Sequence, residues 1–285
     1  MTRTLSLAAL LALAASPGCA SRRYPVSGMV LKVDKERRTL LVSHEAIPGY
    51  MEAMAMPFRV SDAGALDALR PGMKIEFQLV VGPDASYAER LRLKGGARFA
   101  KDPQYAPSPA ASASVPLGHA VPDFELTDQS HRSLRLSQLT GKVVAVTFIY
   151  TRCPLPDYCP RLSSNFARLQ DRFRARLGRD LLLLTVTFDP QYDRPEVLAP
   201  YARGWKADPD GWRFLTGALP EIRRVCGLFG VDFWPDQGLI THSLRTALID
   251  RQGRLAANLE GSEFTLQQLA DLVETVLNAP SSTGS

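Results

Sequence analysis

The first half of the chain shows short apolar segments of strand type separated by turn residues. The segments are GMVLKVD, TLLVS, PFRVS, KIEFQLVV and ERLRLK, and turn sequences such as DKERR, RPG and VGPD lie between them. Five short strands in about 70 residues are typical of a small barrel. We therefore predict an all-β, OB-like barrel of five strands over residues 24–94.

The second half changes to apolar strands that alternate with amphipathic helices. VVAVTFIY and DLLLLTVTF have the continuous apolar character of buried strands, whereas RLSSNFARLQDRFRARL, RPEVLAPYARGW and ALPEIRRVCGLFG have helical spacing. This alternation predicts an α/β domain over residues 117–278. Its end, from residue 245, predicts an antiparallel strand pair turning at Gln252 and Gly253, then a helix that Thr265 can cap.

Two segments lie outside these patterns. Residues 95–116 are rich in Ala, Pro and Ser without a periodic apolar pattern, which predicts a flexible linker. Residues 1–20 carry Arg3, an apolar stretch too short to span a membrane, and small residues before Cys19, which predict an export signal. We expect an exported protein, periplasmic or anchored facing the periplasm, and a lipid on Cys19 would supply a membrane tether.

The composition of the chain excludes some classes of function. A chain of 285 residues is long enough for two cores, and its net charge of +5 comes from basic residues spread along the sequence. Without a basic cluster, nucleic acid is not an expected partner. Beyond Cys19 three cysteines remain, too few for a disulfide scaffold. Cys226 shares an apolar helix face with Ile222, Val225 and Phe229, so we expect it to be buried and inert.

The other two cysteines lie in TRCPLPDYCPRLS, directly after the apolar run VVAVTFIY. Residues just beyond the carboxyl end of such a strand lie at the crevice where α/β folds place their sites. A structural disulfide, a redox pair and a soft-metal site are the alternatives, and a crosslink closing so short a loop would add little stability. Cys159 lies at the start of the next helix, which favours a lowered thiol pKa. Asp189 and Asp193 are interpreted as capping or turn residues.

The segments VTFIYTRCPLPDYCPRLSSNFARLQ, TVTFDPQYDRPEVLAPYA and THSLRTALIDRQGRL resemble the Sco/SenC family. The resemblance implies a thioredoxin-like fold that handles copper for cytochrome c oxidase assembly. In that family two cysteines and a late histidine bind copper, which implies Cys153, Cys159 and His242 as ligands here. Two thiolates and an imidazole also suit Cu(I) or Cu(II) chemically. The family usually has three residues between its cysteines, whereas CPLPDYC has five.

The barrel segment SHEAIPGYMEAMAMPFRV holds one histidine and three methionines. Residues 24–94 resemble the CusF-like periplasmic copper-binding domain, whose Cu(I) is held by a histidine and an MxM pair. The resemblance implies His44, Met54 and Met56 as ligands, and thioethers suit Cu(I). In a strand, Met54 and Met56 would point to the same face. The CusF pattern has a tryptophan before the methionine pair, and here Met51 is the nearest residue that could replace it.

These features together predict an exported copper metallochaperone that collects Cu(I) on the barrel and carries copper on the downstream domain. A cytochrome c oxidase subunit is the protein recipient that the resemblance implies. One alternative is a thiol-disulfide oxidoreductase in which Cys153 attacks and Cys159 resolves, active without copper and indifferent to His242. Another is a copper buffer used for resistance or sensing, without a delivery partner.

Overall fold

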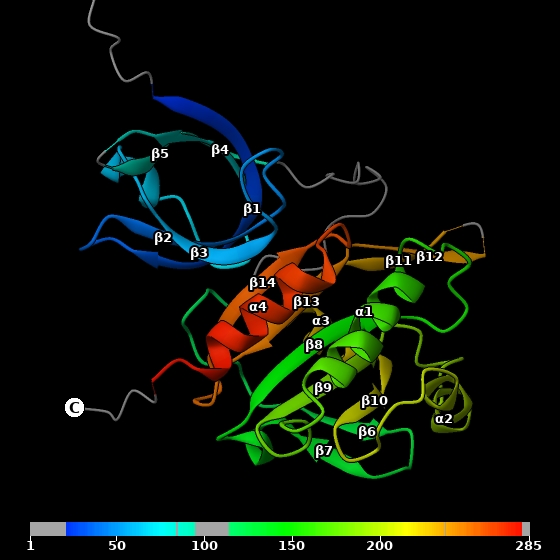
Figure 1. Cartoon of the computed structure of the whole chain (residues 1–285). Helices are drawn as coiled ribbons and strands as arrows, with labels where there is room; N and C mark the ends of the chain where they lie inside the picture. The colour runs from blue at the N-terminus through cyan, green and yellow to red at the C-terminus, as the bar shows by residue number, and fades with distance from the viewer. Residues whose placement is uncertain (1–20, 84, 95–113, 237, 281–285) are drawn as a thin grey trace, which may run out of the picture.

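The computed structural model describes residues 21–83, 85–94, 114–236 and 238–280 (Figure 1). The predicted export signal, Cys19 and most of the predicted linker lie outside the described residues. Within the described ranges, no helix is long and apolar enough to cross a membrane.

The first domain is a barrel of five antiparallel strands, which confirms the predicted fold. Their order in the sheet is β3-β2-β1-β4-β5, and a bridge between Val60 and Ala88 brings the two edges together. A short 3-10 helix, Ala63–Leu66, follows β3. Inward residues such as Val26, Val30, Val42 and Ile75 form the core. The strands are β1 Arg22–Asp34, β2 Thr39–His44, β3 Met54–Arg59, β4 Lys74–Val81 and β5 Ser86–Leu93.

The second domain is α/β, as predicted, with a sheet of order β14-β13-β8-β9-β10-β6-β7. The central strands β8, β9 and β10 run parallel, and the outer strands run antiparallel to their neighbours. The strands are β6 Glu125–Asp128, β7 Ser133–Arg135, β8 Val143–Ile149, β9 Leu181–Thr187, β10 Trp212–Thr216, β13 Arg245–Ile249 and β14 Leu255–Glu260.

In the described part of this domain, four α-helices and a separate hairpin accompany the sheet. The helices are α1 Cys159–Arg172, α2 Pro195–Gly204, α3 Leu219–Leu228 and α4 Leu266–Leu277, with a short 3-10 helix at Leu136–Leu139. Strands β11 Phe233–Asp236 and β12 Leu239–His242 form a separate two-stranded antiparallel sheet.

Two local predictions are confirmed at the end of the chain. Thr265 caps α4, because its Oγ1 accepts a hydrogen bond from the Gln268 N–H at 3.1 Å and the Gln268 side chain accepts one from the Thr265 N–H. The β13–β14 connection turns at Gly253, whose φ of +75° suits glycine. Cys226 is fully buried in α3, as expected.

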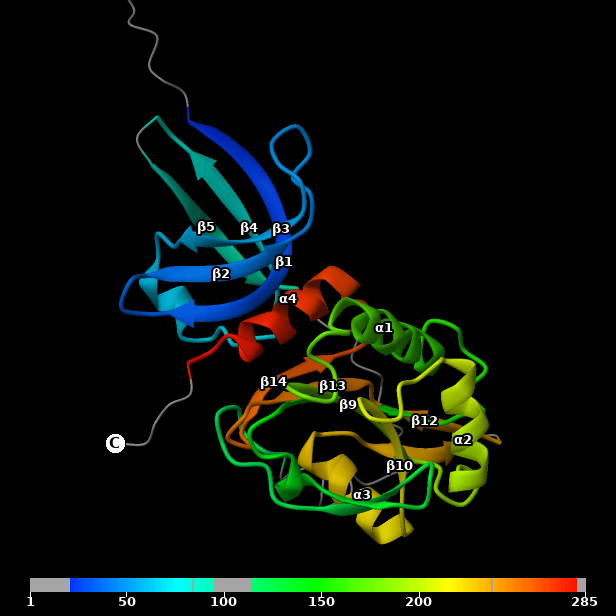
Figure 2. The ribbon, with the colours of Figure 1, turned by 60° about the horizontal axis from the view of Figure 1, so that its bottom comes forward.

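Helix α4 lies between the barrel and the downstream sheet in both views of the ribbon (Figures 1 and 2). Met29 and Leu31, on the outer face of β1, are buried and belong to the core of the second domain. The barrel therefore contacts the α/β domain through β1 and β2, directly over α4.

Candidate metal centre

The two cysteines stand at opposite ends of the loop that joins β8 to α1. The Cys153 N–H donates to the Tyr150 carbonyl at 3.3 Å, which turns the chain immediately after the strand. Cys159 is the first residue of α1 and is fully buried, with Pro160 in the first helical turn where its missing N–H costs nothing. Cys153 is only half-buried, and both are free thiols.

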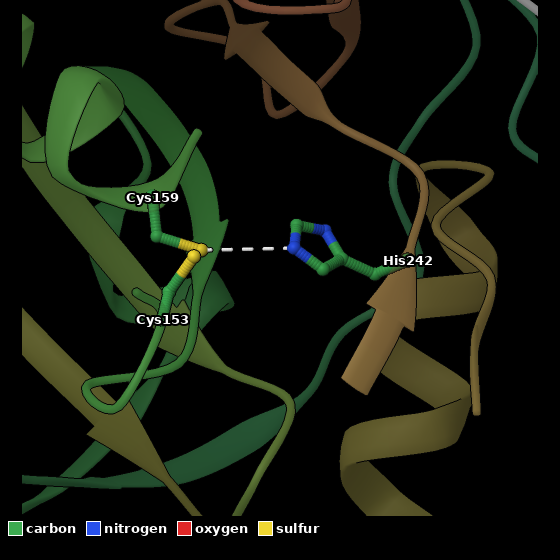
Figure 3. Close-up of side chains that lie close together, drawn as sticks. All are labelled: Cys153, Cys159 and His242. Carbon is green, nitrogen blue, oxygen red and sulfur yellow. Dashed lines mark hydrogen bonds between the residues drawn. The ribbon is translucent and has the colours of Figure 1, made fainter. Parts of the chain in front are cut away.

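His242 reaches the cysteines from the end of β12 (Figure 3). Its Nδ1 lies 3.1 Å from the Ser243 carbonyl oxygen, and a carbonyl can only accept, so Nδ1 carries the proton. The lone pair of Nε2 then faces Cys159 Sγ at 3.7 Å. Phe188 packs against the imidazole with ring centres 4.4 Å apart and restricts its orientation.

The three side chains converge tightly enough to share one ion. The sulfur atoms of Cys153 and Cys159 and a ring nitrogen of His242 lie within 4.8 Å of one another. Two ligands bound at about 2.0–2.3 Å to a common ion lie at most about 4.3–4.6 Å apart, so only small side-chain adjustments are needed. Two soft sulfurs and one imidazole favour copper over Mg²⁺ or Ca²⁺.

The two thiols differ strongly in acidity. A hydrogen bond from Cys159 is the main cause that lowers the pKa of Cys153 from its ordinary value of 9.0. Burial is the main cause that raises the pKa of Cys159, and the adjacent Cys153 thiolate raises it further. The expectation of a lowered pKa at Cys159 was therefore wrong, because burial outweighs its position at the helix start. The more acidic thiol is the more exposed one.

A buried carboxyl group holds the start of the cysteine loop. Asp193 Oδ2 accepts from the Thr151 N–H at 3.0 Å and from Thr187 Oγ1 at 2.5 Å, and Oδ1 accepts from Thr151 Oγ1. Burial raises the pKa of Asp193, while the bonds from Thr151 and Thr187 oppose that rise. Among the residues that the structure describes, no side chain caps α2, so capping is not the role of Asp193. The carboxyl group ties the ends of β8 and β9 together instead.

Asp189 anchors the same loop from its exposed side. Its Oδ2 accepts from Arg152 Nη2 at 2.7 Å, and the Arg152 guanidinium also stacks over the Tyr192 ring at 4.2 Å. Arg152 precedes Cys153 directly, so this ion pair restricts the chain at the more reactive thiol.

Tyr150 is a site residue that the sequence reasoning missed. Burial, followed by the charge on Cys153, raises the pKa of Tyr150 to about 12, and its hydroxyl interacts with Cys153. Its ring stands edge-on to His242, with centres 5.8 Å apart. The sequence contains one signal for Tyr150, because it is the last residue of VVAVTFIY and directly precedes the cysteine loop.

The barrel places the other predicted ligands on neighbouring strands. His44 of β2 is opposite Met54 of β3 in the register, and Val42 is opposite Met56. Residues in such cross-strand positions share a face of the sheet with Cβ atoms about 4.5–5.5 Å apart. His44, Met54 and Met56 therefore lie on one face near the end of the hairpin. Met51 and Met56 both pack against the barrel core.

The two ring nitrogens of His44 have different surroundings. Its Nδ1 lies 2.7 Å from the Glu45 carbonyl oxygen, which places the proton on Nδ1. Its Nε2 is buried and has no hydrogen-bond partner within the described part of the chain. A buried nitrogen lone pair without a partner is costly unless a ligand satisfies it. Met54, which is 45% exposed, leaves this face open to solvent.

Two family models match the chain, SCO1/SenC over residues 114–278 and copper binding periplasmic protein CusF over residues 23–91. A protein of Stutzerimonas stutzeri, whose provisional name is copper-binding protein, is 29% identical over 168 residues, which cover 55% of this chain and 80% of the relative.

Among solved structures, a SCO1/SenC family lipoprotein from Bacillus anthracis is 24% identical with a TM-score of 0.50, covering 55% of this chain and 94% of that one. BsSco, a member of the Sco family of cytochrome c oxidase assembly proteins in which a disulfide switch was identified, is also 24% identical with a TM-score of 0.50. It covers 59% of this chain and 99% of that one. These likenesses establish the thioredoxin-like fold of the second domain. Because the SCO1/SenC model matches more than half of the residues of the chain, the chain belongs to the SCO1/SenC family, and a CusF-like domain precedes its SCO1/SenC domain.

Proposed function

We propose that the protein is an exported copper metallochaperone that carries copper on Cys153, Cys159 and His242. The observation that carries this proposal is the convergence of two thiols and one imidazole within 4.8 Å, with the Nε2 lone pair of His242 directed at Cys159 Sγ. Ligand exchange at these three atoms, rather than bond-making catalysis, would be the activity.

A second copper site in the barrel would collect Cu(I) on His44, Met54 and Met56. The buried, unpartnered Nε2 of His44 and the register of the β2–β3 hairpin support it. Neutral thioethers hold Cu(I) without needing deprotonation, whereas thiolates bind more strongly but depend on their redox state. Copper would therefore flow from the barrel to the thiols.

Delivery to a copper centre of cytochrome c oxidase is the role that membership of the SCO1/SenC family favours. BsSco is a member of the Sco family of cytochrome c oxidase assembly proteins. A lipid on Cys19 would hold the chaperone at the membrane surface, where such a recipient is embedded.

Copper carriage on two thiols would be coupled to redox state. Both thiols must be reduced to bind copper, and joining them as a disulfide expels the ion. The half-buried, acidic Cys153 is the sulfur that an oxidised thiol partner would reach first.

The alternative activity, thiol-disulfide exchange, has one specific observation in its favour. A more exposed thiol of lowered pKa next to a buried thiol of raised pKa is the arrangement of an attacking and a resolving cysteine. The position of His242 within ligand distance favours the copper carrier, because exchange chemistry would not require it.

The copper stoichiometry of the anaerobically reduced mature chain tests the proposal. We expect two Cu(I) per wild-type chain, one in Cys153→Ser/Cys159→Ser, one in Met54→Leu/Met56→Leu, and weaker binding at the thiol site in His242→Ala. Cys226→Ala and Met73→Leu are matched controls that should keep both ions.

Two results would count against the copper carrier. Copper retained in full after loss of both cysteines would contradict the downstream site. Reduction of a disulfide substrate with turnover in copper-free protein, unchanged by His242→Ala, would support the oxidoreductase instead.

A further inference from the structure

Two strands of the barrel are buried on both faces. In β1, Val30 faces the barrel core, whereas Met29 and Leu31 on the opposite face belong to the core of the second domain. In β2, Val42 faces the barrel core, and the Ser43 hydroxyl points the other way, to α4. A barrel that moved freely on a tether would expose this outer apolar face to water.

Helix α4 is buried on the side that faces the barrel as well as on the side that faces the sheet. Leu269, Leu272 and Val273 supply apolar contacts of this helix. Asp271 is only 7% exposed, and its Oδ2 accepts from Ser43 Oγ at 2.7 Å. Its Oδ1 accepts from Gln267 Nε2 at 2.7 Å. A carboxylate this buried needs its partners, and one of them belongs to the barrel.

A second contact connects the barrel with the cysteine loop. Lys74 of β4 lies 3.9 Å from the Glu263 carboxylate, in the turn that follows β14. In the same turn, Ser262 Oγ donates to the Asp157 carbonyl at 2.8 Å, and Asp157 lies in the loop between the two cysteines. The turn at residues 261–263 therefore contacts the barrel on one side and the cysteine loop on the other.

Both metal centres lie next to this interface. Ser43, bonded to α4, directly precedes His44, so the docked face and the ligand lie on opposite sides of the same strand. Lys74 also interacts electrostatically with Glu45 and Arg161, which follow His44 and Cys159 by one and two residues. The interface thus includes residues close in sequence to both sets of proposed ligands.

We propose that the barrel operates docked on α4, through Met29, Leu31, Ser43 and Lys74, and that copper passes between the two metal centres inside this docked unit without separation of the domains. The docking does not depend on copper, whereas the transfer step rests on the proposed function. Transfer within a fixed unit is first order, so its half-time is independent of chain concentration.

Zero-length carbodiimide crosslinking of the full copper-free chain tests docking in solution. It should join Lys74 to Glu263 as an amide across the interface, and Lys35 to Asp67, 2.6 Å apart within the barrel, as an internal control. Leu31→Glu places a charge in the apolar interface, so we expect at least a tenfold loss of the Lys74–Glu263 product with the Lys35–Asp67 product retained. Lys32→Glu, at the exposed neighbouring position, should leave both products unchanged.

Asp271→Lys provides the same test from the α4 side, where the barrel itself is unaltered. Loss of the interdomain product in both variants supports docking. An absent Lys74–Glu263 product in wild type, or an undiminished one in both Leu31→Glu and Asp271→Lys, would overturn it.

The crosslinked chain tests the transfer step. Cu(I) is loaded on the barrel while Cys153 and Cys159 are oxidised, the thiols are then reduced with a phosphine, and arrival at the thiols is followed by thiolate-to-copper absorption. We expect the locked chain to transfer copper with a half-time that does not change over a tenfold dilution. Copper stranded on the barrel of the locked chain would overturn transfer in the docked state. A chain that never binds copper would contradict the proposed function and leave the crosslinking result standing.

Discussion

At the residue scale, the lowered pKa of Cys153 predicts how its alkylation rate depends on pH. A lowered pKa keeps Cys153 as the thiolate well below pH 9, and the thiolate is the form that alkylates. Between pH 8 and pH 6 the alkylation rate of Cys153 in the metal-free chain should fall less than about tenfold, where an ordinary thiol would lose about a hundredfold. Mass spectrometry of iodoacetamide-treated protein measures the alkylation rate. Cys159→Ala removes the main hydrogen-bond donor to the Cys153 thiolate, so the midpoint of the alkylation profile should move toward higher pH.

A substitution at Tyr150 tests whether its hydroxyl stabilises the Cys153 thiolate. Tyr150→Phe keeps the ring beside His242 but removes the hydroxyl that interacts with Cys153. Loss of a hydrogen bond to the thiolate should raise the pKa of Cys153, so the pH profile of its alkylation should shift toward higher pH. Tyr192→Phe, in which the hydroxyl of an exposed neighbour is removed, is the control. An unchanged pH profile in Tyr150→Phe would show that the hydroxyl does not stabilise the thiolate.

At the element scale, the Asp193 carboxyl group joins the ends of β8 and β9 at the base of the cysteine loop. Asp193→Ala leaves the Thr151 N–H and the Thr187 hydroxyl buried without their acceptor, so we expect a loss of about 2–4 kcal/mol in unfolding free energy. Guanidinium denaturation measures the loss. Asp171→Ala, which removes an exposed carboxylate paired with Arg174, should change stability by less than about 0.5–1 kcal/mol. Equal effects in the two variants would refute the structural role of Asp193.

The elements also show how far the sequence could predict this structure. Long apolar runs such as VVAVTFIY and the helical spacing after Cys159 predicted β8 and α1, because burial dictates those patterns locally. Strand β10 was missed because it is only five residues long and lies between two glycines. The residues 159 and 242 are 83 positions apart, and their contact depends on the small β11–β12 hairpin, which no local pattern specifies. Only the family resemblance could join them.

At the scale of the whole molecule, one interface decides whether the two domains are independent. The only sequence signal for it was that GMVLKVD and TLLVS lack polar alternation, which is typical of strands covered on both faces. Because Met29 and Leu31 belong to the downstream core, loss of either domain would expose apolar surface of the other. The stability of each domain is therefore expected to depend on the other, and such coupling is reciprocal.

Calorimetry of the metal-free chain tests this coupling. We expect wild type to unfold in one transition, because the docked domains stabilise each other, and Leu31→Glu to unfold in two, with the first transition several degrees lower. Lys32→Glu should retain the single transition, since its side chain is exposed on the same strand. Two transitions in wild type at the temperatures seen in Leu31→Glu would mean that the interface contributes no stability. A single transition that splits only when Leu31 is changed would instead make the barrel and the thioredoxin-like domain one cooperative unit, in which a ligand that binds either domain stabilises the folded state of both.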